Sequence, residues 1–311
     1  MTDTKIDVFY CPEFSIDGGF ATVGKSAVLA RDLRERPIPG VELRPPVPIE
    51  IDAITRVHDP GYVDAVLAGR RGQFTEHGDA FVESVLASTA GVVRAVESAM
   101  ASGGAAGSLS SGLHHARFDS DSGYCTFNGL VVAALRAREL GAHRVVVIDF
   151  DAHCGGGTAS LIGRLREQGV DGIEQVDVSV SSFDNYPRRP WAHCVVVSGD
   201  GYLAAIDEAL DSIVDPATID VVIYNAGMDP HERAGGVAGV DERVIRERES
   251  RVFSWAAGNG SPIAWVLAGG YPSGGFDVTA VANLHRITIE EAARVATSQP
   301  KSTTTAASAT D

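Results

Sequence analysis

The chain has 311 residues and a formal net charge of −15, with 44% hydrophobic and 22% charged residues. This composition is typical of a globular protein, and the length allows one large α/β domain or two small ones. The acidic balance argues against a nucleic-acid partner, because binding to phosphates needs clustered Lys and Arg. It is compatible with a cationic substrate.

Cysteine usage and hydropathy bear on the compartment. The four cysteines are scattered without paired spacing, which is typical of reduced thiols rather than of a disulfide framework. No signal peptide is visible at the N-terminus, and no segment approaches the roughly 18–20 apolar residues that cross a membrane. We therefore expect a cytoplasmic protein without a membrane partner.

Short segments rich in β-branched residues alternate with longer helical segments. The predicted strands are 6–10, 144–150, 173–180, 220–225 and 263–268, and the predicted helices are 79–100, 127–140, 158–168, 201–213, 241–257 and 278–296. Several strands are nearly continuous runs of Val and Ile, the pattern of strands that are covered on both faces. Strands separated by helices predict crossover connections and a parallel sheet.

Two segments fall outside this alternation. Residues 36–50 are rich in proline, which predicts an extended excursion over the surface. Residues 298–311 have low complexity, which predicts a disordered tail. Neither indicates a second domain, so we expect one domain over residues 1–297.

Polar residues follow three of the predicted strands directly. In open parallel sheets, ligands bind outside the carboxyl ends of the strands, so these polar groups are expected to meet at one edge. They are Asp149, Asp151 and His153 after VVVI, Asn225 and Asp229 after VVIY, and Gly269, Gly270 and Tyr271 after WVLA.

The segment VIDFDAHCGGGT (147–158) has the spacing of a metal site. Because alternate residues of an extended backbone share one side, Asp149, Asp151 and His153 point the same way. Carboxylate and imidazole groups suit a divalent metal, and zinc accepts both. The alternative is a strand end whose aspartates cap the following helix.

Asp229 in NAGMDPHE (225–232) follows another strand of the same predicted sheet. Alone, an aspartate before a proline is a turn residue. Together with Asp151 and His153 it would supply three protein ligands and leave a fourth position for water or substrate, which is how catalytic zinc sites are built.

Two further segments offer catalytic groups. His114 and His115 in SSGLHHA (110–116) can act as base and acid near neutral pH, the alternative being a pair of surface histidines. Tyr271 in LAGGYP (267–272) can present its hydroxyl to a developing oxyanion, the alternative being a tyrosine that packs over a loop.

Six segments resemble, in order and approximate spacing, those of the zinc-dependent histone deacetylase family, which includes acetylpolyamine amidohydrolases. They are VHDPGYVDAVL, GLHHA, GYCTFNGLVVAAL, VVVIDFDAHCGGGT, NAGMDPHE and LAGGYP. The resemblance runs from Val57 to Tyr271. It implies the arginase/deacetylase α/β fold, a three-layer sandwich around a mostly parallel sheet. It also implies an amidohydrolase that removes an acyl group, expected to be acetyl, from an acyl-lysine or an acylpolyamine.

Carried over position by position, the resemblance implies a zinc site and a catalytic pair. Its zinc ligands are Asp151, His153 and Asp229. His114 and His115 become the catalytic pair. Zn²⁺ is therefore the expected cofactor.

The resemblance also implies roles for residues around these groups. Tyr271 becomes the hydroxyl that polarises the substrate carbonyl. Asp149 would orient the first catalytic histidine and, with Ser179, belong to a structural monovalent-cation site for K⁺. Tyr124 and Tyr186 fall where the family has the aromatic walls of its acyl-lysine tunnel.

Two departures from the family pattern bear on the site. Gly156 stands where the family has an aspartate or asparagine that supports the second catalytic histidine. His115 is therefore expected to lack that partner, and turnover of generic substrates is expected to be slow. The segment CPEFSIDGGFATVGKS (11–26) replaces the family's His-Pro-Glu-x-Pro-x-Arg and leaves the tunnel rim unassigned.

Two other functions fit parts of the pattern. Asp151–His153 also fits the two-manganese ureohydrolases, but position 155 is Gly where their motif has a second Asp. A catalytically weak zinc protein that binds acylated ligands is the other alternative, motivated by Gly156 and disfavoured by Tyr271. The acylated amine itself and the oligomeric state stay open.

Overall fold

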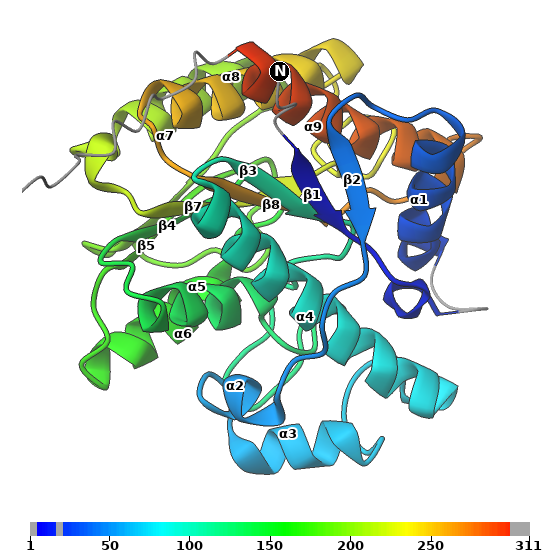
Figure 1. The fold of residues 1–311 in the computed structure, drawn as a ribbon, viewed down its shortest axis with the longest axis vertical. Coiled ribbons are helices and arrows are strands. Elements are labelled where there is room, and N and C mark those ends of the chain that lie inside the picture. The colour runs from blue at the N-terminus through cyan, green and yellow to red at the C-terminus, as the bar shows by residue number, and fades with distance from the viewer. Residues whose placement is uncertain (1–4, 17–20, 299–311) are drawn as a thin grey trace, which may run out of the picture.

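The computed structural model describes residues 5–16 and 21–298, in which strands and helices alternate (Figure 1). In chain order these elements are β1 (Ile6–Phe9), α1 (Lys25–Glu35), β2 (Val41–Arg44), α2 (Ile51–Thr55), α3 (Pro60–Leu67), α4 (Asp79–Ser102), β3 (Ala105–Ser108), α5 (Gly129–Glu139), β4 (Val145–Asp149), α6 (Gly156–Glu167), β5 (Ile173–Ser179), β6 (Ala192–Val196), α7 (Tyr202–Asp211), β7 (Val221–Gly227), α8 (Glu242–Gly258), β8 (Ile263–Ala268) and α9 (Val278–Ser298). The predicted tail, 298–311, lies outside the described residues except for Ser298, which ends α9.

An eight-stranded sheet forms the centre, with the strand order β2-β1-β3-β8-β7-β4-β5-β6. Every pair of neighbouring strands in it is parallel. Parallel neighbours need crossover connections, and helices provide most of them here. The predicted α/β sandwich around a parallel sheet is confirmed.

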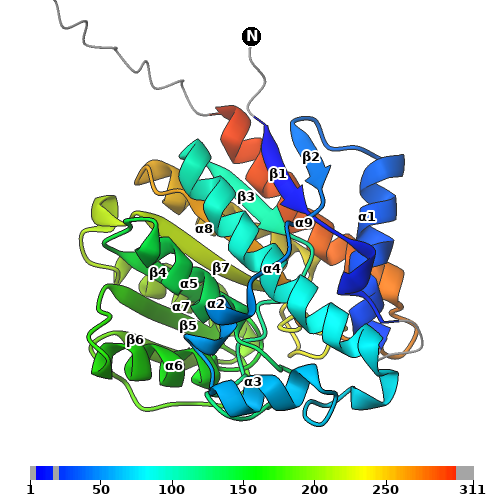
Figure 2. The same cartoon turned by 60° about the horizontal axis from the view of Figure 1, so that its bottom comes forward.

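Helices cover both faces of the sheet (Figures 1 and 2). Helices α1, α7, α8 and α9 pack on one face, and α4, α5 and α6 pack on the other. Strand β4 contributes to both cores, since Val146 and Ile148 face the first layer whereas Val145 and Val147 face the second. All four side chains are fully buried, which explains the unbroken run of Val and Ile.

Strands β2, β3 and β6 lie outside the sequence prediction. β3 reads Ala-Ala-Gly-Ser and has no β-branched residue. A Cβ at Gly107 would lie 2.1 Å from Cε2 of Trp265 on the neighbouring β8, so only glycine leaves room for the indole there.

The proline-rich segment 36–50 also differs from its prediction. Residues 41–44 form β2, which pairs in parallel with β1 at the edge of the sheet. The prediction of a surface excursion is therefore wrong for these four residues, because their backbone is used in the sheet. Their side chains remain partly exposed, as expected for an edge strand.

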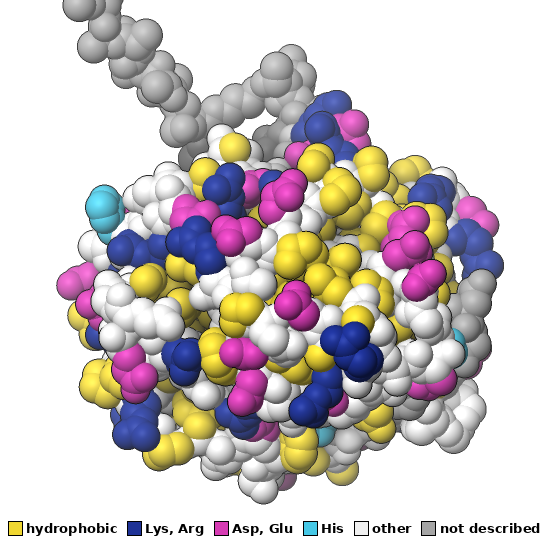
Figure 3. Space-filling model, turned by 90° about the horizontal axis from the view of Figure 1, so that it is seen from below, with side chains coloured by type: hydrophobic (Ala, Val, Ile, Leu, Met, Phe, Trp, Pro, Cys, Tyr) yellow, Lys and Arg dark blue, Asp and Glu magenta, His cyan; other side chains and the backbone are white. Residues whose placement is uncertain are grey.

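The surface mixes charges of both signs. On the face seen in Figure 3, basic and acidic side chains are interspersed rather than gathered into one basic area. Among the described residues, no helix combines the length and the apolar character needed to span a membrane. All four cysteines are free thiols, as the sequence predicts.

Candidate active site

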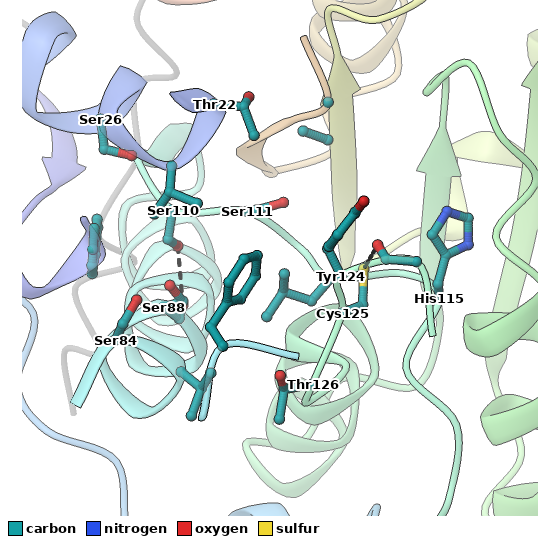
Figure 4. A pocket seen from close by; sticks show the side chains of 18 of the residues that line it. Thr22, Ser26, Ser84, Ser88, Ser110, Ser111, His115, Tyr124, Cys125 and Thr126 are labelled. Carbon is teal, nitrogen blue, oxygen red and sulfur yellow. Dashed lines mark hydrogen bonds between the residues drawn. The ribbon is translucent and has the colours of Figure 1, made fainter. Parts of the chain in front are cut away.

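The four central strands, β3, β8, β7 and β4, end at one edge of the sheet, and the segments that follow them carry the predicted polar groups. A cavity of about 130 Å³ lies there, between these segments and the N-terminal part of α4 (Figure 4). Five predicted site residues line it: His114, His115, Tyr124, Asp151 and Tyr271.

The predicted metal ligands come together at this edge. Asp151, His153 and Asp229 each offer a ligand atom, and these atoms lie within 4.8 Å of one another. Nδ1 of His153 is 3.2 Å from Oδ1 of Asp151 and 3.2 Å from Oδ2 of Asp229. Both carboxylates are buried, and within the described structure the His153 imidazole is the one donor facing Oδ2 of Asp229. Buried carboxylate oxygens need a partner, so this set of donors fits a divalent metal such as zinc.

The ionisable groups of this cluster shift one another's pKa values. Burial, followed by the neighbouring Asp151 carboxylate, raises the pKa of Asp229 to about 6. Burial lowers the pKa of His153, but hydrogen bonds to the two carboxylates outweigh burial and raise this pKa to about 10. The two carboxylates thus stabilise the positively charged imidazole of His153, and a bound divalent cation would supply positive charge at the same place.

His114 is held by Asp149, the last residue of β4. Nδ1 of His114 lies 2.7 Å from Oδ2 of Asp149, and Nδ2 of Asn225 donates to Oδ1 of Asp149 at 2.9 Å. Burial lowers the pKa of His114, but the carboxylates of Asp149 and Asp151 outweigh burial and raise this pKa to about 10. The structure therefore brings Asp149 to the histidine that it was expected to orient, and makes that histidine cationic at neutral pH.

His115 has a carboxylate partner that the sequence did not reveal. Its Nδ1 lies 2.8 Å from Oδ2 of Asp184, which also accepts from the N–H of Gly157 at 3.2 Å, while Arg117 donates to Oδ1. Position 156 offers no partner, as the sequence indicates, and Asp184 from another loop takes that place. A Cβ at Gly156 would lie 2.3 Å from the carbonyl oxygen of Asp184, so the absence of a side chain at 156 makes room for this partner.

Tyr271 follows β8 and lines the same cavity as both histidines. Its backbone N–H donates to the carbonyl of Ala234 at 2.8 Å, which joins its loop to the one that follows β7. Burial, followed by the carboxylates of Asp229 and Asp151, raises the pKa of its hydroxyl well above the ordinary value. The hydroxyl therefore keeps its proton and can donate it in a hydrogen bond.

The aromatic residues around the cavity match the prediction only in part. Tyr124 lines it at a φ of 63° and stacks on Phe74, with ring centroids 5.9 Å apart. Phe183 is 49% exposed and meets the ring of His115 edge-on at 5.0 Å. Tyr186 lines a separate hollow, so its role as a tunnel wall stays a prediction. Phe183 of the same loop contacts the rings of His115 and His153.

Lys25 is a further charged residue of the cavity that the sequence analysis left unassigned. Its side chain is buried, and Nζ donates to the carbonyl of Gly269 at 2.5 Å. Burial lowers the pKa of Lys25 to about 8, although the carboxylates of Asp229 and Asp151 oppose this effect. It belongs to CPEFSIDGGFATVGKS, where no family motif pointed to it.

The predicted K⁺ site involves Asp149 and Ser179. Ser179 ends β5 and is fully buried. The carboxylate of Asp149 is already hydrogen-bonded by His114, Asn225 and the N–H of Asp151. A structural K⁺ at this place stays a prediction.

A buried guanidinium lies behind the segments that carry the ligand carboxylates. Arg248 of α8 donates to the carbonyls of Phe150 at 3.1 Å and of Gly227 at 2.5 Å, directly after β4 and at the end of β7. Glu249 balances its charge through a 2.9 Å hydrogen bond. Since Arg248 is 0% exposed, α8 fixes the spacing of these two segments from within the core.

Fold and site together define an α/β sandwich with a polar cavity at the carboxyl ends of its parallel strands. The histone deacetylase domain matches residues 22–189, which is more than half of the sequence. The chain belongs to the histone deacetylase family.

Individual relatives agree with this assignment. The chain is 28% identical over 254 residues to a probable deacetylase of Methanothermobacter thermautotrophicus, covering 71% of each protein. Over 80 residues it is 32% identical to the acetylpolyamine amidohydrolase of Mycoplana ramosa, covering 26% of this chain and 20% of that one. The solved structure of an acetylpolyamine aminohydrolase from Burkholderia pseudomallei superposes with a TM-score of 0.72 at 17% identity, covering 94% of this chain and 99% of that one, and shows the shared fold.

Proposed function

We propose that the chain is a zinc-dependent deacetylase that removes an acetyl group from an amine, either an acyl-lysine side chain or an acylpolyamine. The observation that carries the proposal is the convergence of the Asp151–His153–Asp229 cluster with two histidines and Tyr271 at one cavity. Membership of the deacetylase family and the stretch shared with an acetylpolyamine amidohydrolase support the substrate class.

Asp151, His153 and Asp229 would hold the zinc ion. When bound, zinc supplies a positive charge that polarises the substrate carbonyl and lowers the pKa of water from ~16 towards ~7. The protein's own contribution is to hold this charge close to a proton acceptor and a hydrogen-bond donor.

His115 is the proton acceptor. Burial, followed by the charge of His114, lowers the pKa of His115, so its imidazole is neutral near pH 7 and can take a proton from the attacking water. The same imidazole can then return this proton to the departing amine. His114 stays cationic beside it, and the Tyr271 hydroxyl donates a hydrogen bond to the developing oxyanion.

The two alternatives have less support. A two-manganese enzyme needs ligands for a second ion, whereas the described residues supply one cluster of three. At position 155, where the two-manganese enzymes have a second aspartate, Gly155 has no side chain, and its backbone N–H donates to Asp177. The weak binding protein was motivated by a histidine without a carboxylate partner, and Asp184 provides that partner.

The proposal is tested by assaying zinc-loaded protein on an acetyl-lysine peptide and on acetylated polyamines, with released acetate as the readout. We expect turnover of at least one substrate class, inhibition by a hydroxamate, and loss of activity in Asp151→Asn. Absence of acetate release from both classes by folded, zinc-loaded protein would refute the proposal.

A further inference from the structure

We infer that Asp184 is the positioning residue of His115, and that it sets which nitrogen of this imidazole carries the proton. Its catalytic consequence rests on the proposed function, in which His115 accepts a proton through its other nitrogen. The residue lies in the loop after β5, 69 positions from the histidine that it contacts.

The hydrogen bonds around the Asp184 carboxylate determine the tautomer. The carboxylate side chain is only 5% exposed and faces three donors: Nδ1 of His115, the N–H of Gly157 and the guanidinium of Arg117. An ionised carboxylate only accepts hydrogen bonds, so Nδ1 of His115 must carry its proton. Nε2 is then left with its lone pair, which is the form that can accept a proton from substrate water.

Arg117 keeps the carboxylate in place. Besides its ion pair with Asp184, it donates from Nη1 to the carbonyl of Gly156 at 2.7 Å, and so joins the loop after β5 to the first residue of α6. A guanidinium stays protonated and cannot accept a hydrogen bond. Arg117 therefore holds an acceptor oxygen towards itself and leaves the second oxygen for His115 and Gly157.

The backbone is adapted to this arrangement at two positions. Asp184 has a φ of 59°, one of four non-glycine residues at positive φ in the described part of the chain. Such a conformation costs free energy and persists where neighbouring contacts enforce it. At Gly156 a Cβ would lie 2.3 Å from the Asp184 carbonyl oxygen and 2.5 Å from Oδ1, so this glycine and this aspartate form a matched pair.

The substitution that isolates the effect is Asp184→Asn. Asparagine tolerates positive φ better than most residues, so the backbone is preserved. However, its amide has one acceptor oxygen and one NH₂ group in place of two oxygens. With the oxygen held by Arg117, the NH₂ group faces Nδ1 of His115 and favours the tautomer protonated on Nε2.

The measurement is ¹⁵N NMR of zinc-loaded, histidine-labelled protein, with His115→Gln identifying the His115 signals. Wild type should show Nδ1–H at His115, and Asp184→Asn should shift it towards Nε2–H. On the substrate that wild type turns over, kcat should fall at least about tenfold in protein that stays folded, with KM and zinc content close to wild type. Asp184→Gly, which also accepts positive φ, should lose activity to a similar degree.

Asp119→Asn is the matched control, since Asp119 is exposed two residues from Arg117, and it should change neither readout. A His115 tautomer and a kcat that are both unchanged in folded Asp184→Asn would overturn the inference. The NMR comparison does not depend on turnover. A wild-type protein without activity would therefore refute the proposed function, while the His115 tautomer would still test this inference.

Discussion

At the residue scale, each imidazole of the His114–His115 pair is fixed by its own carboxylate. Asp149 holds His114 and Asp184 holds His115, while the two rings lie 3.9 Å apart. Burial lowers the pKa of both imidazoles. At His114 the carboxylates of Asp149 and Asp151 outweigh burial and raise the pKa, whereas at His115 the positive charge of His114 lowers it further. Shifts in opposite directions are what one fixed cation and one neutral base require.

The sequence predicted some of these residues and not others for a physical reason. Asp151 and His153 stand two positions apart in the short segment directly after β4, so closeness along the chain already brings them to the same strand end. Asp184 is brought to His115 only by tertiary structure, and no local periodicity connects them. The glycine at 156 indicated a missing partner, whereas the structure shows a partner that enters from another loop.

Gly156→Ala should destabilise the protein, because the new Cβ would meet the Asp184 carbonyl at 2.3 Å. Overpacking of this kind costs about 1–3 kcal/mol, enough to lower the melting temperature by several degrees. Gly163→Ala in the same helix is the control, since its nearest contact is ordinary, at 3.6 Å from Trp191. Thermal unfolding should show a loss at 156 and no loss at 163, and equal melting temperatures would contradict the account of Gly156.

Tyr271→Phe should remove the hydrogen-bond donor to the oxyanion and leave the metal ligands intact. By analogy with the loss of one such donor, kcat should fall by roughly 10²-fold or more. Zinc content, measured by elemental analysis, should stay at the wild-type value. Turnover at the wild-type rate in this variant would exclude the assigned role.

At the element scale, burial on both faces explains which strands the sequence predicts. Strands β4, β7 and β8 are runs of large apolar residues because helices cover both their faces. Strand β3 carries small residues instead, since the indole of Trp265 occupies the space beside Gly107. Its position next to β8 therefore follows from tertiary packing and not from local propensity.

Helix α8 should matter for metal binding although it carries no ligand. Arg248→Met would leave Glu249 buried without its cation and release the carbonyls of Phe150 and Gly227. Breaking a buried pair in this way typically costs about 3–5 kcal/mol. We expect a large drop in melting temperature and weaker zinc binding by competition with a chelator.

Arg251→Met, one turn further along the same helix, is the control, because Arg251 is partly exposed and pairs with surface carboxylates. Its removal should cost at most about 1 kcal/mol and leave zinc affinity unchanged. Equal effects of the two substitutions on zinc affinity would show that Arg248 does not hold the ligand segments.

At the scale of the whole molecule, the alternation of strands and helices was sufficient to predict a parallel sheet between helical layers. The order of its strands was not predictable from local patterns, because β8 inserts between β3 and β7 through contacts far apart in the sequence. The central placement of β3, β8, β7 and β4 is what brings four strand ends to one site. The Asp151–His153–Asp229 cluster is therefore a property of the sheet topology as much as of the motifs.

The stability of metal-free protein should depend on alkaline pH. His114 and His153 have pKa values of about 10 in the fold, above the ~6.5 of an unfolded chain. Their protonated forms stabilise the fold, so this contribution is complete below about pH 6.5 and is lost as the pH rises through about 10. The melting temperature of chelated protein should fall between about pH 7 and about pH 9.5, and less steeply in Asp149→Asn. A melting temperature independent of pH over this range would show that these histidines are not held as described.

Titrating chelated protein with zinc, while measuring deacetylation in the same samples, tests whether one catalytic zinc is held by two aspartates and a histidine. We expect activity to rise with bound zinc and to level off at about one ion per chain. Asp229→Ala should gain neither zinc nor activity. Full activity in chelated protein, or a requirement for two ions per chain, would contradict the claim.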